Sequence, residues 1–304
     1  MDTSLLVYSL LFVVPYLAFK VTRILRKPNF EGKTVWITGA SSGIGEALTY
    51  EFVKRGAQVI ISARNEESLN RVKSNTTQNK VTVLPMDLSD SETALEKAKQ
   101  VTKSHQIDIL VNNAGIGQRS TFISSLDDLF IEKRLMELNY FSVVALTKAV
   151  AKQMIEKRSG QMVVISSVAG LVGSPCRSSY SGSKYAISGF YESMRNELED
   201  FNVNVTTIYP GYVRTDFSKN ALIEGGQTYG QQDQNLAKGM DVEEFATKAV
   251  HSIFLKKREV VIASFLINFV IQMKAFFPAL YFFLLKKGTK SIQESLKAQR
   301  EAKT

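Results

Sequence analysis

The feature that most restricts the fold of this 304-residue chain is the alternation of short apolar runs with longer helical stretches. The apolar runs are continuous and rich in β-branched side chains, as in strands that are buried on both faces. Seven such strands separated by helices predict one α/β domain with a doubly wound parallel sheet. The runs lie at 34–37, 59–62, 81–84, 107–111, 162–165, 203–208 and 260–262. The helical stretches lie at 44–55, 66–74, 91–104, 127–157, 179–200 and 242–256.

The first apolar run leads into a glycine-rich turn, Thr38-Gly39-Ala40-Ser41-Ser42-Gly43-Ile44-Gly45. Glycines let the backbone turn tightly and approach a pyrophosphate, and the helix that follows offers N–H groups and the positive end of its dipole. Because the motif follows a predicted strand and opens a predicted helix, it indicates a dinucleotide site in a Rossmann fold. The residues expected to contact the cofactor here are Gly39, Ser41, Ser42, Gly43, Ile44 and Gly45.

The end of the second strand indicates which dinucleotide binds. An acidic residue about twenty positions beyond the glycines would hold the ribose hydroxyls of NAD, but residues 59–65 contain none. Ser62 and Arg64 stand there, and arginine pairs well with a phosphate. We therefore expect NADP, with NAD as the alternative; Arg64 could also be a solvated charge at a helix entry. Asp87, after the third strand, could accept a hydrogen bond from the adenine amino group or cap the next helix.

The fourth strand ends in Asn112-Asn113-Ala114-Gly115, where small residues would allow a close approach to the cofactor. Asn113 is therefore a candidate cofactor contact. Asparagines at such a position can also lock neighbouring strand ends together, and both interpretations stay open.

The strongest candidate for a chemical role is Tyr180 with Lys184. The two are spaced i, i+4 in a helical stretch, so their side chains share one face. A tyrosine with an ordinary pKa near ~10 is a poor proton donor or base at neutral pH. A nearby ammonium favours the phenolate, so we expect Lys184 to lower the pKa of Tyr180.

These motifs together resemble the short-chain dehydrogenases/reductases, and within them the membrane-associated group around family member 7B. The TGxxxGIG, NNAG and YxxxK motifs of the family match Thr38–Gly45, Asn112–Gly115 and Tyr180–Lys184. Ser167 lies thirteen residues before Tyr180, Asn139 lies forty-one before it, and Pro210-Gly211 follows the sixth strand. The resemblance covers about residues 31–263.

The resemblance implies a role for each matching position. Tyr180 would pass a proton to or from the substrate oxygen, and Ser167 would hydrogen-bond that oxygen. Lys184 would lower the pKa of the tyrosine and hold the nicotinamide ribose, and Asn139 would hold a water that links Lys184 to solvent. Ser166 is a rival for the serine role, but successive strand residues face opposite ways, so Ser167 is preferred.

The resemblance also implies cofactor contacts for Pro210 and Thr215, the latter with the nicotinamide amide. Cys176, in the loop before Tyr180, is expected to line the site without acting as a nucleophile. The predicted function is NADP-dependent interconversion of a carbonyl and a secondary alcohol. An NAD-retaining epimerase and a non-catalytic nucleotide-binding scaffold at a membrane are the alternatives. A homo-oligomer is a further expectation left open.

An apolar segment at the amino end lies outside the alternation. Thr3 to Phe19 carry no charge, and basic residues follow from Lys20. Seventeen residues is about the shortest helix that crosses a bilayer core of ~30 Å. We therefore expect residues 1–30 to be an anchor in the endoplasmic reticulum membrane, with a signal peptide or an interfacial helix as alternatives. The basic flank places the catalytic domain, 31–263, on the cytosolic side, and a lumenal orientation stays open.

A second apolar segment, Phe265 to Leu285, opens the remaining region 264–304 and is interrupted by Gln272, Lys274 and Pro278. It predicts a pair of helices at an interface or on the protein surface. Packing on the domain core and a second span are the alternatives. The side chains expected to face lipid or a lipid-like substrate are Phe276, Phe277, Tyr281, Phe282 and Phe283. With the long irregular stretch 216–239 as a mobile lid, they favour a lipophilic substrate such as a steroid, retinoid or acyl-lipid ketone.

Charge and composition exclude several other classes of protein. The net charge is +9, of which residues 1–33 carry +3 and residues 286–304 carry +4. Basic charge beside apolar segments is typical of attraction to a membrane surface rather than of nucleic-acid binding. One cysteine and two histidines are too few for a disulfide framework, a zinc site or a Cys–His pair.

Overall fold

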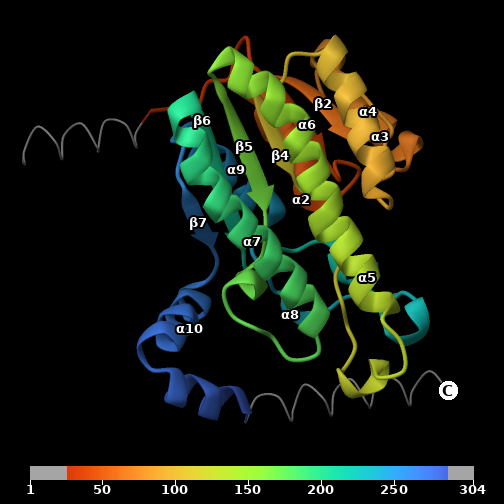
Figure 1. Ribbon diagram of the computed structural model, residues 1–304, viewed down its shortest axis with the longest axis vertical. Coiled ribbons are helices and arrows are strands. Elements are labelled where there is room, and N and C mark those ends of the chain that lie inside the picture. Colours follow the sequence, from red (N-terminus) through yellow and green to blue (C-terminus); the bar gives the residue numbers. More distant parts are fainter. Residues whose placement is uncertain (1–25, 287–304) are drawn as a thin grey trace, which may run out of the picture.

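A seven-stranded parallel sheet forms the centre of the computed structural model, which describes residues 26–286 (Figure 1). The strands are β1 (Thr34–Thr38), β2 (Gln58–Ser62), β3 (Val81–Val83), β4 (Ile109–Asn112), β5 (Gly160–Ile165), β6 (Val203–Pro210) and β7 (Glu259–Ile262). Their order in the sheet is β3-β2-β1-β4-β5-β6-β7. The predicted doubly wound α/β fold is confirmed, and each of the seven apolar runs contributes a strand.

Two apolar clusters pack helices on opposite faces of this sheet. One cluster contains side chains of α2 (Gly43–Lys54), α3 (Glu66–Ser74) and α9 (Val242–Phe254). The other contains side chains of α4 (Ser91–Ser104), α6 (Ser142–Lys157) and α7 (Ser178–Leu198). Neighbouring strand residues alternate between them, since Val35 and Ile37 belong to the first and Trp36 to the second. Both faces are therefore covered, which explains why the strands are apolar throughout.

The order of the strands determines where a ligand can bind. β1 pairs with β2 on one side and with β4 on the other. At such a reversal the loops that leave the two strands diverge, and a crevice opens at their carboxyl ends. The glycine-rich turn follows β1 and the Asn113–Gly115 sequence follows β4, so both predicted motifs lie at this edge.

The stretch predicted as one helix over 127–157 is divided in the structure. It consists of α5 (Phe130–Met136), a π-helical turn η3 (Glu137–Phe141) and α6. The turn carries Asn139 into the interior, where its amide pairs with both backbone groups of Ile116. A π-turn of this kind often marks a functional site, and helical periodicity alone could not indicate it.

Residues 216–239, which we call the lid segment, are largely irregular, as their composition predicts, but include three short helical turns. They contain η6 (Asp216–Ser218), η7 (Glu224–Gly226) and α8 (Gln234–Ala237). The backbone N–H of Arg119 donates to the Leu222 carbonyl at 2.8 Å, and the Leu222 N–H donates to the Gly117 carbonyl at 2.9 Å. The lid segment is thus fastened to the loop that follows β4.

The carboxyl-terminal region forms the predicted helical pair as far as the structure describes it. α10 (Phe265–Phe276) is followed by a break at Phe277 and by a second helical stretch over 278–286. The break comes directly before Pro278, which is well suited to open a helix but not to continue one. Both stretches lie at the lower end of the molecule in Figure 1.

One of the outward-facing residues expected in this pair is buried. Tyr281 is only 4% exposed, and its hydroxyl donates to the Gly173 carbonyl at 3.3 Å. The phenylalanines of the predicted group are exposed as expected, including Phe276 and Phe277. Tyr281 therefore attaches the second helical stretch to the domain.

The expectations about membrane spans have different outcomes. Between residues 26 and 286 the structure has no helix both long and apolar enough to cross a bilayer, and this range includes the segment 265–285. The expected anchor at Thr3–Phe19 and the basic tail beyond residue 286 lie outside the described residues.

Candidate active site

The turn between β1 and α2 has a backbone that only glycines accommodate. Gly39 and Gly43 adopt φ angles of +66° and +58°, which glycine enters without steric cost. A Cβ atom on Gly45 would lie 2.2 Å from the Gly39 carbonyl oxygen. The close approach of α2 to the turn therefore depends on the absence of a side chain at position 45, as a pyrophosphate cradle requires.

The first turn of α2 is open to an anion. Its N-cap residue, Ser42, is extended at φ −164° and ψ 168°, and the Ser42 hydroxyl makes no capping hydrogen bond. By contrast, Asn65 and Asp90 cap α3 and α4 with their side chains. Backbone N–H groups at an uncapped helix start can donate to a phosphate. The turn and the helix start thus fit a dinucleotide.

The two asparagines at the end of β4 make different structural contacts. The Asn113 amide donates to the carbonyl oxygens of Thr38 and Gly39 at 3.0 and 3.1 Å. The Asn112 amide donates to the Tyr191 hydroxyl of α7 at 2.9 Å. The role of holding neighbouring strand ends together is therefore observed for Asn113, whereas Asn112 joins β4 to a helix. A cofactor contact by Asn113 remains a prediction.

Two of the other predicted cofactor residues flank the same region. A Cβ atom on Gly43 would lie 3.2 Å from the Thr215 methyl carbon, so Thr215 borders the turn. Pro210 is buried at the carboxyl end of β6. Arg71 of α3, which sequence reasoning did not select, donates to the Ser41 carbonyl at 3.0 Å and pairs with Glu46. Arg71 lies in the helix that follows β2, and this position was the one sign in the sequence that it could lie near the turn.

The residues expected to select the dinucleotide have separate environments. Arg64 is exposed directly after β2, whereas the Ser62 hydroxyl is buried and accepts a hydrogen bond from the Trp36 indole. The Asp87 carboxylate accepts from the backbone N–H and the hydroxyl of Ser89, both at 2.9 Å. Because Asp90 caps α4, the helix-capping alternative for Asp87 is wrong, and the adenine contact stays a prediction.

Ser167 and Tyr180 meet at the carboxyl end of β5. Ser167 starts the turn η4 (Val168–Gly170), and Tyr180 lies in the first turn of α7, with a hydrogen-bonding interaction between their hydroxyls. Tyr180 is 7% exposed, and its ring packs against Phe217 of the lid segment at a centroid distance of 6.1 Å. The hydroxyl of Ser166 lies 3.0 Å from that of Ser188 instead. The two serines therefore face different ways, as expected.

Lys184 is buried one helical turn beyond Tyr180. Its Nζ atom lies 5.9 Å from the centre of the tyrosine ring and donates to the Ile165 carbonyl at 3.1 Å. A Cβ atom on Gly115 would lie 3.6 Å from this Nζ and 3.0 Å from the Asn139 Oδ1, so both predicted residues flank Gly115. Burial lowers the pKa of Lys184 to about 8, because desolvation disfavours the ammonium.

The electrostatic surroundings of Tyr180 differ from the prediction. Burial is the largest effect and raises the pKa of Tyr180 above its ordinary value. The Ser167 hydroxyl and the charges of Arg177 and Arg119 oppose this rise. Lys184 lies 5.9 Å from the ring centre, and the expectation that its ammonium lowers this pKa stays a prediction. The two arginines are a further source of positive charge that the i, i+4 spacing does not reveal.

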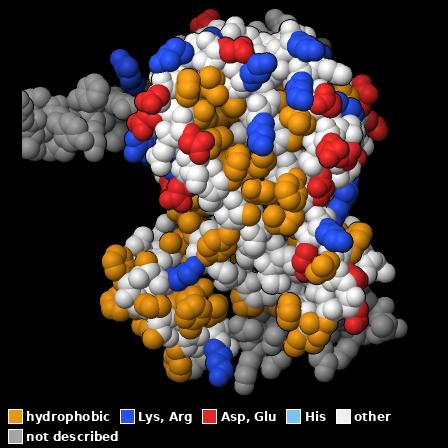
Figure 2. All heavy atoms as spheres, viewed as in Figure 1, with side chains coloured by type: hydrophobic (Ala, Val, Ile, Leu, Met, Phe, Trp, Pro, Cys, Tyr) orange, Lys and Arg blue, Asp and Glu red, His pale blue; other side chains and the backbone are white. Residues whose placement is uncertain are grey.

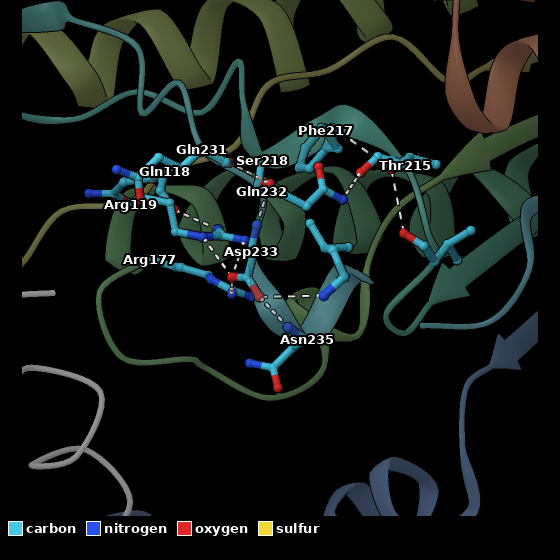
Figure 3. A network of polar contacts seen from close by, with 12 residues as sticks. Gln118, Arg119, Arg177, Thr215, Phe217, Ser218, Gln231, Gln232, Asp233 and Asn235 are labelled. Atoms are coloured by element: carbon cyan, nitrogen blue, oxygen red, sulfur yellow. Dashed lines mark hydrogen bonds and ion pairs between the residues drawn. The ribbon is translucent and has the colours of Figure 1, made fainter. Parts of the chain in front are cut away.

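Figure 3 shows the polar network that includes these arginines. Oδ2 of Asp233, in the lid segment, lies 2.9 Å from Arg119 Nη2 and 3.2 Å from Arg177 Nη2. Gln118 Oε1 accepts hydrogen bonds from the backbone N–H groups of Ser179 and Tyr180 at 2.9 and 3.1 Å. Gln118 thereby caps α7 from the loop after β4.

Sequence reasoning missed all four polar side chains of this network. The available signal was their place in loops at the carboxyl edge of the sheet: Gln118 and Arg119 follow the NNAG motif, and Arg177 precedes Tyr180 by three residues. The pairing itself could not be inferred, because Arg119 and Asp233 are 114 positions apart.

Comparison with known proteins agrees with this geometry. The short chain dehydrogenase family matches residues 33–224. A Drosophila melanogaster dehydrogenase/reductase SDR family protein 7-like is 37% identical over 88% of this chain and 83% of that protein. The chain belongs to the short-chain dehydrogenase/reductase family. The family member 7B of Mus musculus is 34% identical over 90% of this chain and 86% of its own length. The protein is thus an oxidoreductase of this family.

Solved structures share the fold. A short-chain dehydrogenase/reductase from Burkholderia phymatum, in complex with NAD, matches with a TM-score of 0.72 and 20% identity over 84% of this chain and 96% of its own. A short-chain dehydrogenase from Burkholderia cenocepacia J2315, in complex with NADP, matches with a TM-score of 0.69 and 24% identity over 84% and 98%. These likenesses show a Rossmann-like α/β fold.

Proposed function

We propose that the protein is an NADP-dependent oxidoreductase that interconverts a carbonyl compound and a secondary alcohol. The observation that carries this proposal is the meeting of Ser167, Tyr180 and Lys184 at one edge of the sheet. The glycine-rich turn after β1 opens on the same edge. A bound nicotinamide would supply or accept the hydride.

Tyr180 is the proton donor to the substrate oxygen in the reductive direction. Hydride addition to a carbonyl builds negative charge on the oxygen, and a proton from the phenol neutralises it. The Ser167 hydroxyl can donate a hydrogen bond to the same oxygen and stabilise its charge. Because burial raises the pKa of Tyr180, the phenol stays protonated at neutral pH. Alcohol oxidation needs the phenolate and is therefore favoured at higher pH.

Lys184 and Asn139 support this proton transfer. With a pKa of about 8, Lys184 can take up and release a proton near neutral pH, and its ammonium would donate to the nicotinamide ribose. Asn139 Oδ1 accepts one hydrogen bond from the Ile116 N–H. A carbonyl oxygen has two lone pairs, so Asn139 can also hold a water that connects Lys184 to solvent.

Arg64 is the residue we propose to favour NADP. It is exposed at the end of β2, and a guanidinium can pair with the phosphate on the adenine ribose. Arg71 lies against the same turn, but its guanidinium already pairs with Glu46 and the Ser41 carbonyl.

A lipophilic substrate, such as a steroid, retinoid or acyl-lipid ketone, is supported by two groups of exposed apolar side chains. Figure 2 shows apolar side chains gathered at the lower end of the molecule, where Figure 1 places α10 and the 122–130 segment. Phe265 is 87% exposed and Phe276 is 72% exposed. The other large exposed apolar side chains are Leu266, Phe269, Phe277, Leu280, Phe282, Phe283 and Leu284 in the first group, and Phe122, Ile123, Leu126, Leu129 and Phe130 in the second.

The first of these groups is attached close to the site. Lys274 of α10 donates to the Leu171 carbonyl at 2.8 Å, and Tyr281 donates to the Gly173 carbonyl. Both acceptors lie in the loop that joins Ser167 to Tyr180. An apolar face beside the site would let a lipid substrate enter from a membrane surface, which agrees with the proposed cytosol-facing location at the endoplasmic reticulum.

The test is turnover of a panel of ketones with NADPH and NADH in parallel. Tyr180→Phe should lose at least about 100-fold in kcat. Full turnover by Tyr180→Phe would refute the assignment of the acid. Equal kcat/KM for small polar carbonyls and lipid ketones would refute the lipophilic substrate.

A further inference from the structure

Helix α7, which carries Tyr180 in its first turn, has no side-chain cap of its own. Its N-cap residue is Arg177, at φ −146° and ψ 33°, and the Arg177 side chain makes no capping hydrogen bond. A guanidinium has N–H donors only, so it cannot accept from the free backbone N–H groups at a helix start. By contrast, α3, α4 and α9 are capped by Asn65, Asp90 and Asp241. The start of α7 therefore depends on an acceptor from elsewhere in the chain.

Gln118 provides this acceptor from the loop after β4, next to Arg119 in Figure 3. Its Oε1 atom accepts from the backbone N–H groups of Ser179 and Tyr180 at 2.9 and 3.1 Å. Its Nε2 atom donates to the Ser120 hydroxyl at 3.0 Å, and both side chains are fully buried. Because water has no free access to Gln118, loss of Oε1 would leave two N–H groups unpaired.

The loop that carries Gln118 is itself fixed on two sides. The Arg119 N–H donates to the carbonyl of Leu222, in the lid segment, at 2.8 Å. The Ser120 N–H donates to the carbonyl of Cys176, two residues before α7, at 3.2 Å. The Gln118 oxygen is thus held at a defined place relative to the start of α7.

The backbone carbonyl of Tyr180 is fixed as well. The Ser183 hydroxyl donates to this carbonyl at 2.8 Å and accepts from the Asn139 amide at 3.0 Å. Side chains therefore bond both backbone groups of Tyr180, the N–H through Gln118 and the carbonyl through Ser183. Helix ends open more easily than helix centres, so these contacts decide how firmly the first turn holds the tyrosine.

We propose that Gln118 is a positioning residue, which caps α7 and thereby holds the Tyr180 phenol beside Ser167 for proton transfer. The proposal rests on the proposed function, because Tyr180 is the proton donor in that reaction. A displacement of about 1 Å at a reacting group can lower the rate about 100-fold. The cap should therefore affect kcat much more than it affects cofactor binding.

The experiment compares substitutions of Gln118 in the full chain. Gln118→Met keeps the length of the side chain but removes Oε1 and Nε2. It should lower kcat about 10- to 100-fold and leave the Kd for NADPH, measured by calorimetry, within about twofold. Gln118→Glu keeps an acceptor oxygen, whose negative charge a helix start favours, and should restore most of the lost kcat. The comparison uses kcat at the pH optimum of each variant, because a carboxylate near Tyr180 changes its pKa.

A second measurement needs no substrate. Hydrogen exchange of the backbone N–H groups over 178–181, followed by mass spectrometry, reports how firmly the first turn of α7 is held. Loss of a helix cap should make this exchange about 10-fold faster in Gln118→Met. Gln118→Glu should show the exchange of the wild type.

Gln153→Met is the matched control. The Gln153 Oε1 accepts from the Ile107 N–H at 2.6 Å, and its Nε2 donates to the carbonyl oxygens of Thr102 and His105. This substitution removes a similar set of bonds to the backbone, but between α6 and the end of α4. It should lower the stability and leave both kcat and the exchange over 178–181 unchanged.

Wild-type kcat in Gln118→Met, in an enzyme that Tyr180→Phe inactivates, would overturn the proposal and leave the proposed function standing. Unchanged exchange over 178–181 would also overturn it, as would equal losses of kcat in Gln118→Met and Gln118→Glu. If Gln118→Met fails to fold, Gln118→Asn decides the question. Its amide is one methylene shorter, so the oxygen is drawn back from the two N–H groups, and the same changes in kcat and exchange are expected.

The exchange measurement also separates this proposal from the proposed function. A chain without oxidoreductase turnover would refute the function. Faster exchange in Gln118→Met would then still support the role of Gln118 in holding Tyr180, and unchanged exchange would refute both.

Discussion

Replacing Gly45 by alanine tests whether the approach of α2 to the turn creates the dinucleotide site. The new Cβ atom would lie 2.2 Å from the Gly39 carbonyl oxygen and 2.6 Å from the Asn113 Nδ2. Both distances are about 1 Å or more below ordinary contact, and one neighbour is backbone. The start of α2 or the Gly39 turn must therefore move, and overpacking of this kind costs about 1–3 kcal/mol.

The displaced groups are the ones expected to bind the cofactor pyrophosphate. A loss of about 2 kcal/mol in binding free energy corresponds to a roughly 30-fold higher Kd for NADPH. Calorimetric titration with NADPH measures this change, and urea unfolding measures the accompanying loss of stability. Gly189→Ala is the matched control. Gly189 is exposed on α7, and its Cβ atom would have no neighbour within 4 Å. It should gain about 0.5–1 kcal/mol in stability from helix propensity and bind NADPH as the wild type does.

The result that would refute this reasoning is a Gly45→Ala protein with wild-type affinity for NADPH and wild-type stability. Lower stability with unchanged affinity would place the clash away from the cofactor. In that case the interpretation of the turn as a cradle would fail, although the packing argument would stand.

Three other substitutions test single contacts. Lys184→Met should raise the free energy of unfolding by up to about 3 kcal/mol at pH 7. The pKa of Lys184 is about 8 in the folded state and about 10.5 in the unfolded state, so its protonation destabilises the native protein below pH 8. The stability advantage of Lys184→Met should therefore fade as pH rises from 8 to 10.5. If the ammonium were well solvated, urea unfolding across this range would show no such trend. Arg64→Ala should weaken NADPH binding about 10-fold and leave NADH binding unchanged, and equal losses for both would contradict the phosphate contact. Tyr191→Phe should cost about 1–2 kcal/mol in urea unfolding, because Asn112 and Thr147 both bond its hydroxyl, and an unchanged stability would show that these bonds contribute nothing net.

The fold was predictable because its signals are local. The periodicity of an apolar run depends on neighbouring residues only, and parallel strands require helical connections between them. Helix caps were less predictable: the sequence offered Asp87 as a cap for the helix after β3, whereas Asp90 caps α4. The π-turn at 137–141 was not predictable, because its stabilising contacts join Asn139 to Ile116 and Ser183. The hydrophobic periodicity of a single segment carries no information about such long-range contacts.

The candidate site was predictable as a set of residues but not as an electrostatic environment. The spacing of Tyr180 and Lys184 correctly predicts a shared helix face, yet it says nothing about how deeply either residue is buried. In the structure burial dominates both: it raises the pKa of Tyr180 and lowers that of Lys184. The spacing therefore identifies the pair, whereas the ionisation of its two members depends on burial, about which the spacing carries no information.

This difference changes which part of the chain controls the chemistry. If Lys184 alone determined the pKa of Tyr180, that pKa would depend on a single turn of α7. Any chain with the same Tyr–Lys spacing would then have a similar tyrosine pKa. Burial raises that pKa and Arg119 and Arg177 oppose the rise, so the environment of the phenol also depends on residues far from α7 in the sequence. Phe217 of the lid segment packs against the tyrosine ring, and Asp233 of the same segment pairs with both arginines. A substitution in the lid segment can therefore change the proton affinity of Tyr180 even though the Tyr180–Lys184 spacing is unchanged.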